Sequence, residues 1–171
     1  KTDYPHDKLE WLILDKTNEV KDQLVEDPRI KYFPCNVKSK QKLSKGQKLN
    51  ALVKNTTGDI ILHMFEGNYY SPHHVLSRVR TLLTYPDYQC VGSTLIGCYN
   101  IMNNTSFTLK ELDVHKNSTV LHEASMAYTK DFWKYIQFEE LILNDNNKNI
   151  VSLPFLANRL NVVIDIPYDY I

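Results

Sequence analysis

The sequence predicts a single α/β domain in which helices flank a mixed, mainly parallel sheet. Apolar runs and amphipathic stretches alternate along the first half of the chain at the spacing of strand–helix–strand units. Beyond residue 90 the apolar runs become shorter and lose this alternation, which predicts a mixed sheet. A length of 171 residues is enough to enclose one hydrophobic core.

The first half of the chain carries clear start signals for strands and helices. Residues 9–15 form an apolar run that ends in Asp15, typical of a strand buried on both faces. Thr17 and Ser44 can cap helices through their side-chain oxygens, and Ser71 followed by Pro72 is a typical helix start. We therefore expect strands at 9–15, 30–35 and 59–64, and helices at 17–24, 44–54 and 71–83. The buried stripe expected on the last helix consists of Val75, Leu76, Val79, Leu82 and Leu83.

The second half predicts shorter elements. Residues 127–138 carry Phe132, Trp133 and Ile136 at helical spacing, which predicts a helix with these side chains inward. The other expected elements are strands at 90–101, 107–112, 119–122 and 162–166, a polar loop at 144–149 and a short helix at 154–160.

Composition excludes several classes of partner. Lys and Arg number 20 and Asp and Glu number 20, so the net charge gives no long-range attraction to nucleic acid. The three cysteines show no metal-binding spacing, and no apolar run approaches the length of a membrane span. These features predict a cytoplasmic or virion-associated protein. Because the chain opens with Lys1 and reaches a strand within a few residues, we expect residues 1–171 to be a single domain that is incomplete at its N-terminus.

Three segments, in order, resemble one family. They are KGQKLN at 45–50, GDIILHM at 58–64 followed by YYSP at 69–72, and HEASMAYT at 122–129. Together they resemble the GT-A glycosyltransferases grouped with family 2, close to small enzymes of bacteria and large DNA viruses. The resemblance implies a GT-A fold whose first strand is missing. A protein partner or a second copy is then expected to fill that gap, because unpaired buried backbone groups each cost about 1–3 kcal/mol.

The resemblance also implies sites for a nucleotide sugar and its metal ion. The family holds Mg²⁺ or Mn²⁺ with an Asp-x-Asp cluster, but this position reads Phe65-Glu66-Gly67-Asn68 and keeps one carboxylate, Glu66. No metal is therefore expected unless the site still functions. The residues that the resemblance assigns to the nucleotide sugar are Asp15, Lys16, Lys48, Asn50 and Glu66.

The general base that glycosyl transfer needs is also altered. Residues 149–153, which precede Phe155-Leu156, contain no acid where the family often has one, so Glu123 is the best remaining candidate base. Its alternative role is to stabilise the helix expected after it.

Two functions follow from the resemblance. The first is a glycosyltransferase-like protein without catalysis, with a structural or interaction role, for example in a large DNA virus particle. The alternative is an active, metal-independent transferase that uses Lys16 or Lys48 on the diphosphate and Glu123 as base, and moves a sugar to a protein or glycan.

Overall fold

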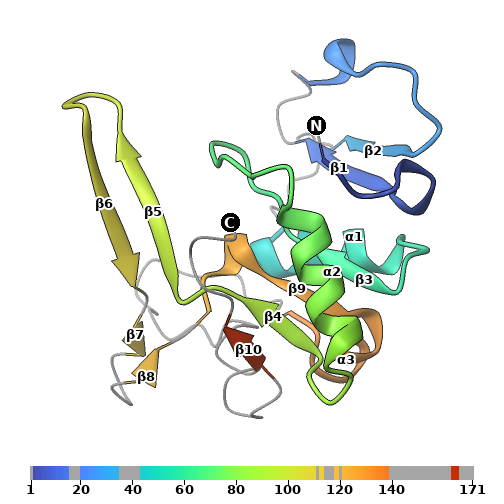
Figure 1. The fold of residues 1–171 in the computed structure, drawn as a ribbon. Helices are drawn as coiled ribbons and strands as arrows, with labels where there is room; N and C mark the ends of the chain where they lie inside the picture. The colour runs from blue at the N-terminus through green and yellow to red at the C-terminus, as the bar shows by residue number, and fades with distance from the viewer. Residues whose placement is uncertain are drawn as a thin grey trace. The chain divides into compact units, whose positions relative to one another are not determined.

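The computed structural model describes residues 2–15, 20–34, 43–110, 112–113, 118–119, 121–138 and 163–165 (Figure 1). Three short 3₁₀ turns lie at His6–Lys8, Lys21–Gln23 and Glu123–Ser125. The helices are α1 (Lys45–Lys54), α2 (His74–Thr84) and α3 (Lys130–Ile136). The strands are β1 (Trp11–Asp15), β2 (Ile30–Pro34), β3 (Ile60–Leu62), β4 (Cys90–Gly92), β5 (Leu95–Asn100), β6 (Thr105–Lys110), β7 (Leu112–Asp113), β8 (Ser118–Thr119), β9 (Ala127–Thr129) and β10 (Val163–Asp165).

The chain divides into two compact units. Unit 1 comprises Lys1–Tyr4, Asp59–Ile136 and Val151–Ile171, and unit 2 comprises Pro5–Gly58 and Gln137–Ile150. Each unit has its own sheet, so each is described by itself below.

Unit 2 is built from the parallel pair β1–β2 and helix α1. In this pair Trp11 lies opposite Ile30, and Asp15 lies opposite Pro34. Helix α1 begins after Ser44, whose hydroxyl accepts from the backbone N–H of Gln47 at 3.1 Å while the Gln47 side chain accepts from the Ser44 N–H at 2.9 Å. This reciprocal capping satisfies two N–H groups that a helix start leaves free. The predicted helix at 44–54 is confirmed.

A single carboxylate connects β1 to two other segments of unit 2. Glu10 accepts from the Lys31 ammonium at 2.7 Å, from the Thr57 hydroxyl at 3.0 Å and from the Gly58 N–H at 3.0 Å. Burial alone would raise the pKa of Glu10, but these hydrogen bonds outweigh it and hold the pKa at about 2. The ionised side chain therefore fastens β1 both to β2 and to the segment after α1.

Unit 1 is built on a four-stranded sheet in the order β10-β4-β9-β3. Strand β9 runs antiparallel to both of its neighbours, so that Tyr128 lies opposite Ile61 on one side and opposite Cys90 on the other. The core of this sheet consists of Leu82 of α2 with Val91 and Ala127, and Ile60 and Leu62 pack against them. Tyr128 is fully buried because it lies on the central strand.

Strands β5 and β6 form an antiparallel hairpin separate from that sheet (Figure 1). Asn100 pairs with Thr105, and residues 101–104 form the turn. Asn104 has a φ of 55°, in the left-handed region that asparagine tolerates better than most residues. The backbone conformation of Asn104 thus allows a short turn, and residues 95–110 form the hairpin without a contribution from distant parts of the sequence.

The predicted GT-A fold, with one mainly parallel sheet, is wrong. The described strands form the four-stranded sheet and three separate two-stranded sheets, and four of their six pairings are antiparallel. Two features of the chain account for the difference. The short turn at 101–104 closes β5 and β6 as an antiparallel pair, and β9 inserts between β3 and β4 in the opposite direction.

Several predicted elements also differ. The helix expected at 127–138 begins at Lys130, because residues 127–129 form the central strand β9 instead, and the Thr129 hydroxyl then accepts from the Phe132 N–H at 3.2 Å. On α2, Leu76 and Leu83 are exposed, whereas His74 and Arg78 join the buried face. The described part of the helix expected at 17–24 contains a 3₁₀ turn only. The strand expected at 162–166 is confirmed as β10, and the elements expected at 144–149 and 154–160 lie outside the described residues.

Candidate functional site

The residues that the resemblance assigns to a nucleotide sugar are divided between the two units. Asp15, Lys48 and Asn50 belong to unit 2, whereas Glu66 and Glu123 belong to unit 1. Lys16 lies outside the described residues. Each unit is therefore considered separately for what its candidate residues can do.

Asp15 is buried at the end of β1, where it is engaged in folding contacts. Its carboxylate accepts from the Tyr32 hydroxyl at 2.9 Å and from the Val20 N–H at 3.0 Å. Burial, followed by the bond to the Asp15 carboxylate, raises the pKa of Tyr32. The acid that was expected to contact a nucleotide thus fastens β1 to β2 and to the segment that follows β1.

Asn50 faces the chain's own backbone. The residue is 1% exposed on α1, and its amide donates to the Phe138 carbonyl and accepts from the Phe138 N–H, both at 2.9 Å. This two-way bond satisfies a buried peptide group that would otherwise lose its partners. Lys48, two residues earlier on α1, is partly exposed.

Glu66 is exposed in the turn that follows β3. The turn is closed by Gly67, which has a φ of +80°, and the Asn68 side chain donates to the Phe65 carbonyl at 3.3 Å. Over the part of the chain that the structure describes, no three His, Cys, Asp or Glu side chains are grouped so that they could hold a metal ion. The Glu66 position therefore presents one exposed carboxylate on a turn.

Glu123 lies close to a buried histidine–tyrosine pair that the sequence did not reveal. His63 Nε2 lies 3.0 Å from the Tyr128 hydroxyl, and the two rings meet edge to face. Burial raises the pKa of Tyr128 well above its ordinary value, and the charges of Cys90 and Glu123 add to this effect. His63 directly follows β3, but Tyr128 was expected on a helix, so the pairing could not be seen before the strand register was known.

A buried cation lies on the inner face of α2. The Arg78 guanidinium is fully buried; its Nε donates to the Ser125 carbonyl at 2.6 Å and its Nη1 donates to the His74 carbonyl at 3.3 Å. Within the described residues, Arg78 Nη2 and both ring nitrogens of His74 have no hydrogen-bond partner. The Tyr70 ring packs on the His74 ring with centroids 4.6 Å apart. Arg78 thus connects α2 to the turn before β9, and the hydrogen-bond acceptors named here are backbone carbonyls.

His74 should make the stability of the protein fall in mild acid. Burial, followed by the nearby Arg78 charge, lowers the pKa of His74 from 6.5 to about 3. Below pH 6.5 His74 becomes protonated in the unfolded chain but stays neutral in the folded chain. This contribution to stability is therefore complete above pH 6.5 and declines as the pH falls toward 3, by at most about 1.4 kcal/mol per pH unit. Tyr70 and Arg78 are the other ionisable groups that face this ring.

Urea unfolding between pH 6.5 and 4.5 tests this expectation, since Glu10 begins to add its own effect below its ordinary pKa of 4.5. His74→Phe, which keeps a ring beside Tyr70, should flatten the pH dependence, whereas His73→Gln at the exposed neighbouring position should leave most of it. Parallel curves for the native chain and His74→Phe would show that His74 is not the group responsible.

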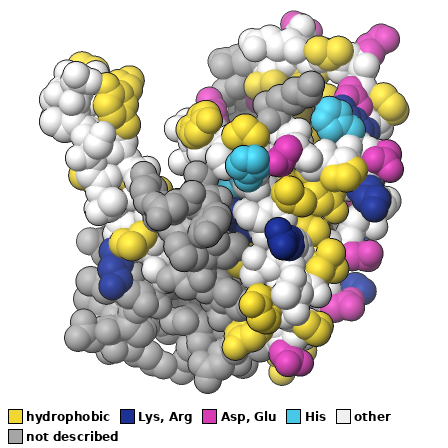
Figure 2. Space-filling model, in the orientation of Figure 1, with side chains coloured by type: hydrophobic (Ala, Val, Ile, Leu, Met, Phe, Trp, Pro, Cys, Tyr) yellow, Lys and Arg dark blue, Asp and Glu magenta, His cyan; other side chains and the backbone are white. Residues whose placement is uncertain are grey.

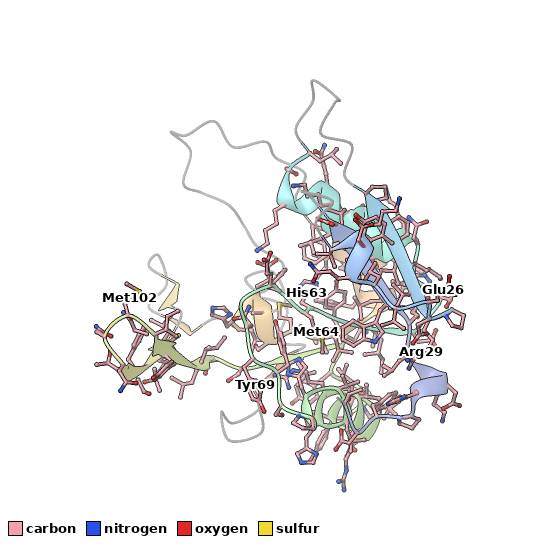
Figure 3. The ribbon with its side chains drawn as sticks, turned by 90° about the horizontal axis from the view of Figure 1, so that it is seen from above. Glu26, Arg29, His63, Met64, Tyr69 and Met102 are labelled. Atoms are coloured by element: carbon pink, nitrogen blue, oxygen red, sulfur yellow. The ribbon has the colours of Figure 1, made fainter. Side chains whose placement is uncertain are left out.

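The β5–β6 hairpin of unit 1 exposes several large apolar side chains. Ile101 and Met102 at its turn are 81% and 90% exposed, and Tyr99, Phe107 and Leu109 on its strands are about half exposed. Figure 2 shows hydrophobic side chains gathered at the end of the β5–β6 hairpin, and Figure 3 shows Met102 there. Single exposed apolar residues are ordinary on protein surfaces, but a contiguous group indicates an interaction site.

No protein-family model matches this sequence, and no curated protein sequence matches it. The helices among the described residues are all too short or too polar to cross a lipid bilayer.

Proposed function

We propose that this chain is a catalytically inactive relative of the nucleotide-sugar glycosyltransferases that works by binding a protein through its β5–β6 hairpin. The observation that carries the proposal is the exposed apolar surface of the hairpin. The relation to glycosyltransferases rests on the sequence segments at 45–50, at 58–64 followed by 69–72, and at 122–129. The proposed place of action is the cytoplasm or a virus particle.

The contacts of the candidate residues support the loss of catalysis. The Asp15 carboxylate and the Asn50 amide, which the resemblance assigns to the nucleotide, are both buried and bonded to the chain itself. Using them for a ligand would require breaking these bonds, each of which contributes about 0.5–1.5 kcal/mol to stability. The Glu66 position supplies one carboxylate, whereas a divalent cation needs several oxygen ligands, and the described residues contain no cluster of ligating side chains.

One observation favours the alternative of a metal-independent transferase. Glu123 is partly exposed, and its charge acts on the buried Tyr128 hydroxyl. A carboxylate that is both reachable and close to a second polar group has the chemistry of a general base. In this alternative, Glu123 accepts the proton of the acceptor hydroxyl.

Thermal unfolding with a panel of nucleotide sugars, each with and without Mn²⁺, tests the proposed function. A donor present at about 100 times its dissociation constant stabilises a protein by about 2.7 kcal/mol. For a chain of this length that raises the unfolding midpoint by roughly 5–10 °C. We expect no shift with any donor, because the groups assigned to the nucleotide are engaged in folding contacts.

The other outcomes separate the alternatives. A shift that needs Mn²⁺ would contradict the loss of the metal site and would name the donor. A shift without metal would favour the metal-independent enzyme, and loss of turnover in Glu123→Gln would then support Glu123 as its base.

A further inference from the structure

The two faces of the β5–β6 hairpin differ in polarity. Residues directly opposite each other in an antiparallel pair lie on the same face of the ribbon. Ile96 pairs with Leu109 and Cys98 pairs with Phe107, so one face, here named the apolar face, carries these four residues. On the other face, Gly97 pairs with Thr108 and Tyr99 pairs with Ser106, which makes it the more polar one.

The part of the chain that the structure describes leaves much of the apolar face open to solvent. Phe107 and Leu109 are 48% and 47% exposed, and Ile101 and Met102 extend the apolar surface around the turn. With about 150–200 Å² for each large side chain, the exposed parts of these four residues amount to on the order of 400–500 Å². A two-stranded ribbon is at best marginally stable in water, so its apolar face needs a second layer.

The charge of the hairpin decides what this second layer is. Lys110, at the end of β6, is the one charged residue of these two strands, and it pairs with Leu95 on the more polar face. The apolar face therefore carries no charge, so two identical apolar faces can meet without repulsion. A twofold contact requires this self-compatibility, because the same patch is used by both copies.

Resting on the proposed function, we infer that the partner is a second copy of this chain, bound by packing the apolar faces of two hairpins against each other. The two ribbons then form a small sandwich with layers about 10 Å apart. The exposed apolar area of one hairpin is about half of the roughly 800 Å² that each partner contributes to a standard interface, and the polar rim around it supplies further contact area.

Sedimentation equilibrium over a range of protein concentrations tests the inference. The native chain is expected to approach twice its mass of 20.0 kDa as the concentration rises. Phe107→Lys combined with Leu109→Lys should remain at 20.0 kDa, because it places two desolvated charges on the apolar face. Ser106→Lys with Thr108→Lys adds the same charge to the opposite face of the same strand and should still dimerise.

A second measurement uses the native fold and so does not depend on how the lysine variants fold. Cys98 lies on the apolar face and is partly exposed, whereas Cys90 is fully buried. In a Cys35→Ser background, a short bismaleimide should therefore link two chains through Cys98, and the further change Cys98→Ser should abolish the link.

The results distinguish this inference from the proposed function. A native chain that stays at 20.0 kDa at every concentration, or a Ser106→Lys/Thr108→Lys variant that loses the dimer as fully as the apolar-face variant, would overturn the inference. Neither result bears on the proposed function, which predicts that nucleotide sugars leave the unfolding midpoint unchanged. A donor-induced shift would overturn the proposed function even in a dimer.

Discussion

Asn50→Ala is expected to lower the free energy of unfolding by about 2–5 kcal/mol. The substitution removes both hydrogen bonds to Phe138, and taking away the partner of a buried N–H or carbonyl costs about 1–3 kcal/mol each, of which other contacts of Phe138 recover a part. Urea denaturation measures the change. If Asn50 served only to bind a ligand, its replacement would leave the stability of the free protein nearly unaltered.

The same helix provides the control for this experiment. Asn55 ends α1, is exposed, and donates its amide to the Ala51 carbonyl at 2.8 Å. Asn55→Ala should change the free energy of unfolding by about 0.5 kcal/mol or less, as surface substitutions usually do. Equal losses from Asn50→Ala and Asn55→Ala would contradict the structural role assigned to Asn50.

Arg78→Lys is expected to destabilise the protein more than Arg78→Met, although lysine keeps the charge. Lysine brings a compact charge into the same buried position but cannot reproduce the guanidinium fork that donates to the Ser125 and His74 carbonyls. An uncompensated buried charge costs about 3–5 kcal/mol. Methionine removes the charge, so its cost is about 1–3 kcal/mol for the carbonyls that lose a donor.

Urea denaturation of the two variants shows which substitution lowers the free energy of unfolding more, and this ranking tests how the site holds its cation. Burial lowers the pKa of Arg78 to about 10, which agrees with a cation held by carbonyl groups. If Arg78→Lys proved the milder substitution, the site would be holding its cation by charge, through an acid or a bound anion. The arrangement of Arg78 over the turn before β9 would then need another explanation.

Local features of the fold could be predicted from the sequence, and the pairing of its strands could not. The start of α1 was predictable because Ser44 and Gln47 lie three residues apart and complete a capping pattern within one turn. Residues 127–129 precede a helix and share its apolar character, so nothing local distinguishes them from a helical turn. Their place between β3 and β4 depends on residues more than 30 positions away, and this placement makes the sheet mixed.

The sequence could predict which elements carry the candidate residues, but it could not predict what those side chains contact. The sequence indicates that Asp15 ends a strand, which is confirmed, yet its bond to Tyr32 depends on the register of β1 against β2. Likewise Asn50 lies on a predicted helix, but its partner Phe138 is 88 residues away. The strands of the hairpin were expected, whereas the exposure of their apolar side chains was not, because apolar strand residues are usually buried.

Hydrogen–deuterium exchange of the native chain at high and at low protein concentration tests the central claim most directly. If two copies of the chain bind each other through the hairpin, amides of residues 95–110 should exchange slowly in the concentrated sample and faster after dilution, while the core strands β4 and β9 stay equally protected in both. Exchange in the hairpin that is fast at every concentration would contradict the claim that this element binds a second copy of the chain.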